Sequence, residues 1–255
     1  MKIILGGAMG RMGAEMRKLV SQSNDMIVCG VDLVKNDPLD FPCYTSFSDI
    51  PCDLTADLLI DFSKPSALAD LLPFAVSNHL PCVLCATGYS EQQLRTIEEA
   101  SHSIAILRSA NMSLGINMML ELCTLAAHAL PDFDIEIVEK HHRLKQDAPS
   151  GTALMLYEKI ASERTEAKQV LGRSGSNRMR RNGEIGISAI RGGTVIGEHE
   201  VGFYGEGEQV ILTHRAENRG LFAKGALTAA AFLLQQPAGM YSMREVVRNK
   251  LTEVI

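Results

Sequence analysis

The chain has 255 residues, of which 46% are hydrophobic and 22% charged, and its net charge is −5. This length suits one large domain or two modest ones, and the composition is that of an ordinary soluble globular protein. The acidic balance argues against nucleic acid as the main partner, and no apolar run reaches the roughly 18 residues that span a bilayer, so no membrane partner is expected.

The first segment, "MKIILGGAMG", has one lysine and four apolar residues before its glycines. This run is too short for the apolar core of a signal peptide, and it is typical of a buried strand. We therefore expect a cytoplasmic protein.

Up to about residue 110, short apolar runs alternate with helix-like stretches. The predicted strands are 2–7, 26–32, 56–63, 81–88 and 103–110, and the predicted helices are 10–23, 65–79 and 90–102. Pro73 should kink or end the second of these helices. The alternation predicts βαβ units and a parallel sheet.

From about residue 113 the pattern changes to longer helices and alternating strands. The predicted helices are 114–130, 152–167, 221–236 and 241–251, the predicted strands are 132–142, 185–193, 195–205 and 208–218, and a polar loop covers 171–184. Glycine turns join the last three strands. This half is therefore predicted to be an α+β domain with a largely antiparallel sheet.

The first predicted strand runs into "GGAMGRMG", which places Gly7, Gly10 and Gly13 at three-residue intervals. The dinucleotide fingerprint is G-x-G-x-x-G, so this loop is a variant of it. Gly7 allows a tight turn, Gly10 lets the backbone approach a pyrophosphate, and Gly13 lets the helix pack closely. The helix N-terminus would face the anion, and Arg11 adds positive charge there. Many glycine loops are only turns, but one between a strand and a helix predicts nucleotide binding.

Asp32 ends the second predicted strand, about 20 residues after the loop, where an acid can accept hydrogen bonds from a ribose. Its charge would repel a 2′-phosphate, whereas Lys35 nearby would attract one. The predicted cofactor is therefore NADH and/or NADPH, and we expect a preference for NADH.

The chain has six cysteines, and Cys82 and Cys85 form a C-x-x-C pair. A zinc site would need a second pair or histidines at ligand spacing, and the sequence has neither. Residues three apart on a strand point to opposite faces, so we interpret this pair as buried, reduced thiols and expect no metal.

The segment "EKHHRLKQDAPSGTA" gathers two histidines, a lysine and a Ser-Gly-Thr turn. On a strand, His141 and His142 would point to opposite sides, which makes them poor ligands for one metal. Ser150 and Thr152 stand at a predicted helix N-terminus, which suits a carboxylate or phosphate, and Lys145 adds a cation. A histidine suits acid catalysis because its ordinary pKa is about 6.5. The cluster predicts a substrate site, although Lys145 alone could be a surface charge and Ser150 a helix cap.

Arg219, in "AENRGLFAKG", is a second cation that could meet the substrate. A surface salt bridge explains this arginine equally well.

These motifs resemble those of the 4-hydroxy-tetrahydrodipicolinate reductase family, also called dihydrodipicolinate reductase, over nearly the whole chain. "GAMGRMG" is similar to the family's nucleotide loop, "DFSKP" to its strand-end motif and "CATGYS" to its G-T-T-G turn. "SANMSLGIN" is similar to its interdomain segment and "EKHHRLKQDAPSGTAL" to its long signature. "IRGGTVIGEHEVGFYGEGEQVILTHRAENR" and "GMYSMREVV" resemble its later strands and C-terminal helix.

The resemblance implies an α/β fold in which an N-terminal Rossmann dinucleotide-binding domain, residues 1–112 and 221–255, is completed by the C-terminal helices. An inserted α+β domain, residues 113–220, would bind the substrate and assemble a homotetramer. The family reduces 4-hydroxy-tetrahydrodipicolinate, a small cyclic dicarboxylate, to tetrahydrodipicolinate with NADH or NADPH, in diaminopimelate and lysine biosynthesis.

The resemblance also implies roles by position. His141 would be the proton donor and Lys145 the second catalytic group. The substrate contacts would be His142, Ser150, Gly151 and Thr152, with Arg219 as the added cation. The cofactor contacts would be Gly7, Ala8, Met9, Gly10, Arg11, Met12, Asp32, Cys85, Ala86, Thr87, Ser109, Ala110, Asn111 and Met112.

Three positions depart from the family pattern. Cys85-Ala86-Thr87 replaces Gly-Thr-Thr, which removes a hydroxyl and adds a side chain beside the nicotinamide. Met112 stands where an aromatic residue is common. Leu33 stands where some members have an arginine for the 2′-phosphate, which weakens the case for tight NADPH binding.

Two alternatives stay open. Another Rossmann dehydrogenase, acting on an amino acid or a polyol, would share the cofactor loop but ignore the tetrahydrodipicolinate precursor. A sensor that kept the fold and lost catalysis would bind the dinucleotide without turnover, although the intact His-His, Lys and Ser-Gly-Thr set argues against it.

Overall fold

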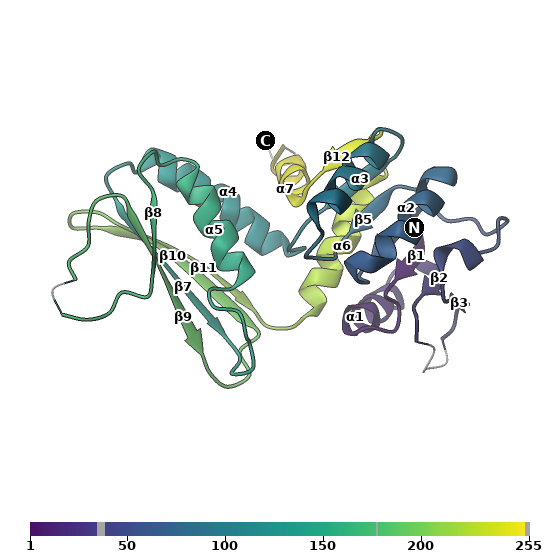
Figure 1. Ribbon diagram of the computed structural model, residues 1–255, viewed down its shortest axis with the longest axis horizontal. Coiled ribbons are helices and arrows are strands. Elements are labelled where there is room, and N and C mark those ends of the chain that lie inside the picture. The colour runs from purple at the N-terminus through teal and green to yellow at the C-terminus, as the bar shows by residue number, and fades with distance from the viewer. Residues whose placement is uncertain (35–38, 177, 253–255) are drawn as a thin grey trace. The chain divides into compact units, whose positions relative to one another are not determined.

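The computed structural model describes residues 1–34, 39–176 and 178–252, and Figure 1 shows their helices and strands. The chain forms two compact units. The first unit combines Met1–Leu114 with Arg219–Ile255, and the second is Gly115–Asn218. None of the described helices has the length and apolar character to cross a bilayer.

The first unit contains a seven-stranded sheet in which every pair of neighbouring strands is parallel. Its strands are β1 (Lys2–Gly6), β2 (Met26–Val31), β3 (Cys43–Tyr44), β4 (Leu58–Asp61), β5 (Cys82–Leu84), β6 (Ala105–Arg108) and β12 (Gly239–Tyr241). Their order is β12-β6-β5-β4-β1-β2-β3. The chain thus builds outward from β1 on one side and from β4 on the other, and the topological switch point lies between these two strands.

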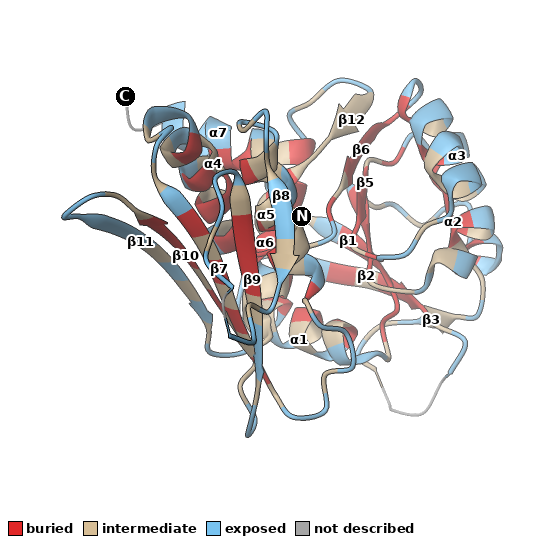
Figure 2. Cartoon of the chain, turned by 60° about the vertical axis from the view of Figure 1, so that its left-hand side comes forward, coloured by how far each residue is buried: buried red, intermediate tan, exposed pale blue. Residues whose placement is uncertain are grey.

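Helices cover both faces of this sheet because the residues of each strand alternate between the faces. The helices are α1 (Arg11–Val20), α2 (Leu68–Ser77), α3 (Glu91–Ser101), α6 (Gly220–Leu233) and α7 (Met243–Thr252). Ile3 of β1 is buried with Met16 of α1 and Ala226 of α6, whereas the next residue, Ile4, is buried with Ile97 of α3. The predicted Rossmann domain, completed by C-terminal helices, is confirmed, and Figure 2 shows its central strands as buried.

Helix α2 does not end at Pro73. A 3-10 turn, Pro65–Ala67, leads into the helix, which continues past Pro73 to Ser77. The missing N–H of Pro73 removes a single helical hydrogen bond. The exposed proline leaves Leu72 and Ala75 buried against the sheet, and their burial holds the helix together.

The second unit has five strands in the order β11-β10-β7-β9-β8, and two helices pack on one face of this sheet. The strands are β7 (Asp134–His141), β8 (Lys168–Leu171), β9 (Glu184–Arg191), β10 (Gly197–Tyr204) and β11 (Gln209–Ala216), and the helices are α4 (Leu114–Ala129) and α5 (Gly151–Ala161). Alternation in β7 buries Ile135 and Ile137 against these helices and leaves Val138 half-buried on the other face.

The prediction of a largely antiparallel sheet is wrong, because the sheet is mixed. β10 pairs antiparallel with β7 and β11, but β9 pairs parallel with β7 and β8. The connection from β7 to β9 contains α5, and a crossover of this length is what a parallel pair requires. Strand β8 was not predicted, since its four residues are exposed or half-buried and show little apolar pattern.

Candidate functional site

The predicted cofactor segments meet at one edge of the seven-stranded sheet. The carboxyl ends of five strands pair directly in register: Gly6↔Val31, Gly6↔Asp61, Asp61↔Leu84 and Leu84↔Arg108. Residues 7–12, Asp32, 85–87 and 109–112 each follow one of these ends. In open α/β sheets this edge, at the switch point, is where ligands bind.

The glycine loop has the backbone that a pyrophosphate site requires. Gly7 adopts a φ of 71°, and a Cβ on it would lie 2.8 Å from the carbonyl carbon of Phe62. A Cβ on Gly13 would lie 2.3 Å from the Gly7 oxygen, so α1 packs directly on the loop. Gly10 begins α1 without a side-chain cap, and Arg11 and Met12 open its first turn. The residues present therefore fit a dinucleotide phosphate at the start of α1.

Asp32 lies beside this loop. Its carboxylate accepts hydrogen bonds from the N–H of Met9 (2.9 Å) and the N–H of Val34 (3.2 Å). Leu33, the residue after Asp32, is exposed. This position suits a ribose and opposes a 2′-phosphate. Lys35 lies outside the described residues.

Cys85, Ala86 and Thr87 follow β5, and they are half-buried, buried and exposed in turn. The N–H of Cys85 donates to the carbonyl of Asp61 at 2.9 Å, and Cys82 and Cys85 are free thiols. Burial, with a smaller effect of the Asp61 charge, raises the pKa of both thiols well above the usual value. Thiols in this state are weak nucleophiles at neutral pH.

The segment after β6 is held by its own side chains. The Ser109 hydroxyl donates to the Asn111 carbonyl (2.8 Å), and the N–H of Ser113 donates to Asn111 Oδ1 (2.9 Å). Ala110 is exposed, whereas Met112 is buried in the core and a Cβ on Gly225 would lie 1.7 Å from its carbonyl oxygen. A cofactor contact at Met112 would therefore involve its backbone.

The signature segment begins at the end of β7. His141 is the last residue of the strand and is buried, and its Nδ1 lies 2.6 Å from Glu139 Oε2 on the same face. His142 follows the strand end and is half-buried, and its backbone carbonyl accepts a hydrogen bond from the N–H of Lys145 at 3.1 Å. Burial lowers the pKa of His141, Glu139 opposes that effect, and the Lys145 and Arg191 cations reinforce it.

Glu139 is the centre of a hydrogen-bond network that the sequence did not reveal. Its carboxylate is completely buried and accepts Arg191 Nη1 (2.8 Å), Arg191 Nη2 (2.7 Å), the N–H of Ser150 (3.0 Å) and His141 Nδ1. Burial alone would raise the pKa of Glu139, but these donors outweigh burial and hold it below the usual value. The alternation of β7 places Glu139 beside His141, which is the signal that could have identified it.

His199 of β10 is a second buried imidazole in the network. Its Nε2 lies 3.1 Å from the Ser150 hydroxyl, and its ring meets the His141 ring edge-on at 5.2 Å between centroids. Burial and the neighbouring His141 lower the pKa of His199 to about 4, so it is neutral at physiological pH. The register of β10 against β7 pairs His199 with Glu139, and only the fold reveals that pairing.

The N-terminus of α5 forms the other part of the site. Ser150 caps the helix, because its hydroxyl accepts the N–H of Ala153 at 3.2 Å. A Cβ on Gly151 would meet nothing within 4 Å, so this helix start faces open space. Lys145 Nζ forms an ion pair with Asp147 at 2.8 Å. An open helix start with a cation nearby can bind a carboxylate.

Arg219 belongs to the first unit, where it directly precedes α6. Its carbonyl accepts the N–H of Phe222 at 3.1 Å.

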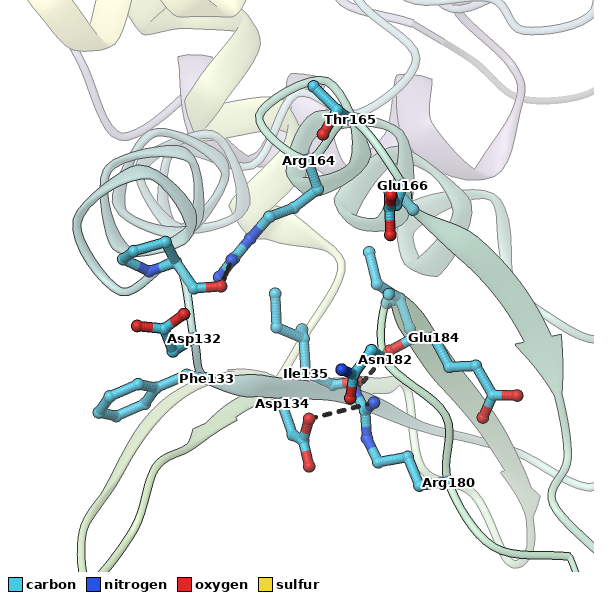
Figure 3. Close-up of a pocket in the computed structure, with 14 residues that line it drawn as sticks. Asp132, Phe133, Asp134, Ile135, Arg164, Thr165, Glu166, Arg180, Asn182 and Glu184 are labelled. Carbon is cyan, nitrogen blue, oxygen red and sulfur yellow. Dashed lines mark hydrogen bonds and ion pairs between the residues drawn. The ribbon is translucent and has the colours of Figure 1, made fainter.

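A pocket of about 490 Å³ lies at the other end of β7, beside Asp134 and Ile135 (Figure 3). Its arginines are already engaged: Arg180 pairs with Asp134 at 3.2 Å, and Arg164 donates to backbone carbonyls before β7. The predicted site residues do not line it. Within the described ranges, no group of three or more histidines, cysteines or acids could hold a metal.

Two family models match the chain. One, described as dihydrodipicolinate reductase, N-terminus, matches residues 1–112, and the other, described as dihydrodipicolinate reductase, C-terminus, matches residues 115–247. A 4-hydroxy-tetrahydrodipicolinate reductase from Caldanaerobacter subterraneus subsp. tengcongensis is 45% identical over 97% of this chain and 98% of its own length. The reductase of the same name from Clostridium novyi is 43% identical over 98% of this chain and 99% of its own length.

Among solved structures, dipicolinate-bound dihydrodipicolinate reductase from Paenisporosarcina sp. TG-14 is similar in fold. Its TM-score is 0.80 at 23% identity, and the match covers 94% of this chain and 97% of that chain. The agreement of family models, relatives and fold confirms the resemblance seen in the sequence. The chain therefore belongs to the dihydrodipicolinate reductase family and is an oxidoreductase.

Proposed function

We propose that this chain catalyses the reaction for which its relatives are named, the NAD(P)H-dependent reduction of 4-hydroxy-tetrahydrodipicolinate to tetrahydrodipicolinate. The observation that carries the proposal is a single segment in which a buried histidine, His141, ends a strand shortly before the open N-terminus of α5. A proton donor and a carboxylate site in one segment match a cyclic dicarboxylate substrate.

His141 is the proton donor in this proposal. Loss of the substrate's 4-hydroxyl as water leaves a conjugated ring imine, to which the bound nicotinamide supplies a hydride. His141 Nε2 then gives a proton to the ring position that holds the electron pair after hydride addition, and the imidazolium becomes neutral imidazole. Hydride and proton together add two electrons and two protons, that is two hydrogen atoms, to the dehydrated ring.

The remaining predicted substrate residues hold the carboxylates. The backbone of Gly151 and Thr152 receives one carboxylate at the helix start, with Ser150 and His142 beside it. Lys145 supplies charge, and a substrate carboxylate would compete with Asp147 for it. Arg219 is the candidate for a further contact with the substrate.

The cofactor segments at the sheet edge hold NADH or NADPH. The start of α1 supports a pyrophosphate, and Asp32 supports a ribose with a preference for NADH, because a 2′-phosphate would meet its charge. The segments 85–87 and 109–112 complete the contacts at the ends of β5 and β6. We place the enzyme in the cytoplasm, where its six free cysteines would stay reduced.

We also propose that residues 1–112 and 221–255 bind the nucleotide, and that residues 113–220 bind the substrate and form a homotetramer. The face of the second sheet opposite α4 and α5 supports this assembly. It carries the half-buried Val138 and the exposed Ile190 and Ile211, beside Gly186 and Gly202. Exposed apolar residues on a sheet face mark an interaction surface, and sedimentation velocity measures the assembly directly.

His141→Ala tests the assigned chemistry. We expect kcat to fall about 100-fold or more, because general acid catalysis contributes that much, with little change in cofactor affinity. The measurements are steady-state kinetics and fluorescence titration with NADH.

The matched control is His128→Ala, since His128 is an exposed histidine of α4 that pairs with Glu163. A His141→Ala enzyme with wild-type kcat would remove His141 from the mechanism.

A further inference from the structure

Glu139 is a charged residue without any exposed surface, and its environment is built to keep it ionised. Arg191 binds both carboxylate oxygens, the N–H of Ser150 binds one, and His141 Nδ1 binds the other. Burying a carboxylate is costly unless donors satisfy it, and here all the donors converge from separate segments.

The backbone presets this geometry. Glu139 and His141 are two residues apart on β7 and therefore face the same side. The parallel register pairs Arg191 of β9 with His141, and the antiparallel register pairs His199 of β10 with Glu139. A Cβ on Gly197 would lie 3.0 Å from His141 Nε2, so β10 leaves room for the imidazole at this point.

The contact with Glu139 decides which nitrogen of His141 can transfer a proton. A carboxylate accepts only, so Nδ1 must carry the hydrogen in their 2.6 Å contact. The nitrogen left to gain and lose a proton is Nε2. The charged and titratable groups around this ring are Glu139 on β7, Arg191 on β9, His199 on β10 and Lys145 in the following loop.

We propose that Glu139, held in place by Arg191, is a positioning residue that fixes His141 in the orientation and tautomer in which Nε2 donates the proton. This inference rests on the proposed role of His141 as proton donor. Through the N–H of Ser150, the same carboxylate also ties the start of α5 to His141, so one group aligns the proton donor and the carboxylate site.

The direct test is the tautomer of His141 in the free enzyme, read by nitrogen-15 NMR of labelled histidine. Wild type should show the Nδ1–H form. In Glu139→Gln, the Arg191 donors claim the single amide oxygen, and the amide NH₂ then donates to Nδ1. The neutral ring must therefore carry its hydrogen on Nε2.

A second variant separates this mechanism from a general loss of structure. The matched control is Glu184→Gln, which breaks another carboxylate–arginine pair of the same sheet, Arg173 to Glu184 at 2.6 Å. Glu184→Gln should leave the His141 tautomer unchanged.

The catalytic consequence appears in the pH profile. A proton donor must be charged, so kcat falls as pH rises through the pKa of His141. Loss of the Glu139 charge disfavours the imidazolium, so in Glu139→Gln this fall should begin about one pH unit lower, with kcat reduced about tenfold above it. Glu184→Gln should keep the wild-type profile.

The tautomer and the pH profile of Glu139→Gln can each overturn the proposal. An Nδ1–H tautomer that persists in Glu139→Gln, or a pH profile that does not move, overturns the proposal. Should His141→Ala retain wild-type kcat, the proposed proton donor is wrong, and the tautomer still reports independently whether Glu139 orients the ring.

Discussion

At the residue scale, the site places two imidazoles in contact and keeps only one of them available for proton transfer. His199 is buried, bonded to Ser150 and next to the His141 ring, and its pKa of about 4 keeps it neutral. His141 sits against a carboxylate that supports its charged form. A neutral His199 avoids repulsion when His141 is protonated.

The lowered pKa of His199 also makes stability depend on pH. Between about pH 6.5 and pH 4 the unfolded chain binds a proton at His199 that the folded chain excludes. Unfolding is therefore favoured as pH falls, and the expected loss from pH 7 to pH 5 is about 2 kcal/mol.

The measurement is urea unfolding of wild type and His199→Asn at both pH values. The variant should lose about 2 kcal/mol less than wild type over this range, because other acid-sensitive groups are common to both proteins. Equal losses in the two proteins would show that His199 is not excluded from protonation in the folded state.

The sequence predicted candidate site residues that lie close together in the chain, such as His141, Lys145 and Ser150. It did not identify Arg191 or His199, because these reach the site through strand pairing. Register between strands depends on the whole hydrophobic pattern and the connections, which no short motif encodes. The parallel pairing of the first sheet, by contrast, followed from the βαβ alternation.

At the element scale, the second sheet has one covered face and one open face. Alternation in β7 and β10 sends Ile137 and Val201 toward the helices and leaves Val138 on the other side. β11 adds Ile211 to the open face through its pairing with Gly202. The mixed order of this sheet was not predicted, because turn signals suggest hairpins and do not reveal that β7 and β9 lie side by side.

Ile211→Glu tests whether the open face joins subunits. A charge introduced there should shift the protein from tetramer to smaller species in sedimentation velocity, since an unpaired charge within an apolar interface is costly. The matched control is Leu125→Glu, which adds a charge at an exposed leucine of α4. Identical sedimentation of wild type and Ile211→Glu would exclude this face as the interface.

At the scale of the whole molecule, the family prediction is confirmed across both units by two family models and by relatives that match nearly the full length. The parallel sheet of the first unit also confirms the Rossmann prediction. This prediction succeeded because the alternating pattern of strands and helices is local and repeated. Fold alone does not choose a substrate, since one fold supports many reactions. The segment that contains His141 and the start of α5 argues against the two alternatives, an amino-acid or polyol dehydrogenase and a sensor without turnover.

The most direct test of the central claim is steady-state oxidation of NADH and of NADPH by the purified protein with enzymatically generated 4-hydroxy-tetrahydrodipicolinate. The account predicts turnover with this substrate, faster at low cofactor concentration with NADH because of Asp32, and none with amino acids or polyols. Cofactor binding without oxidation of either nucleotide in the presence of this substrate would contradict it.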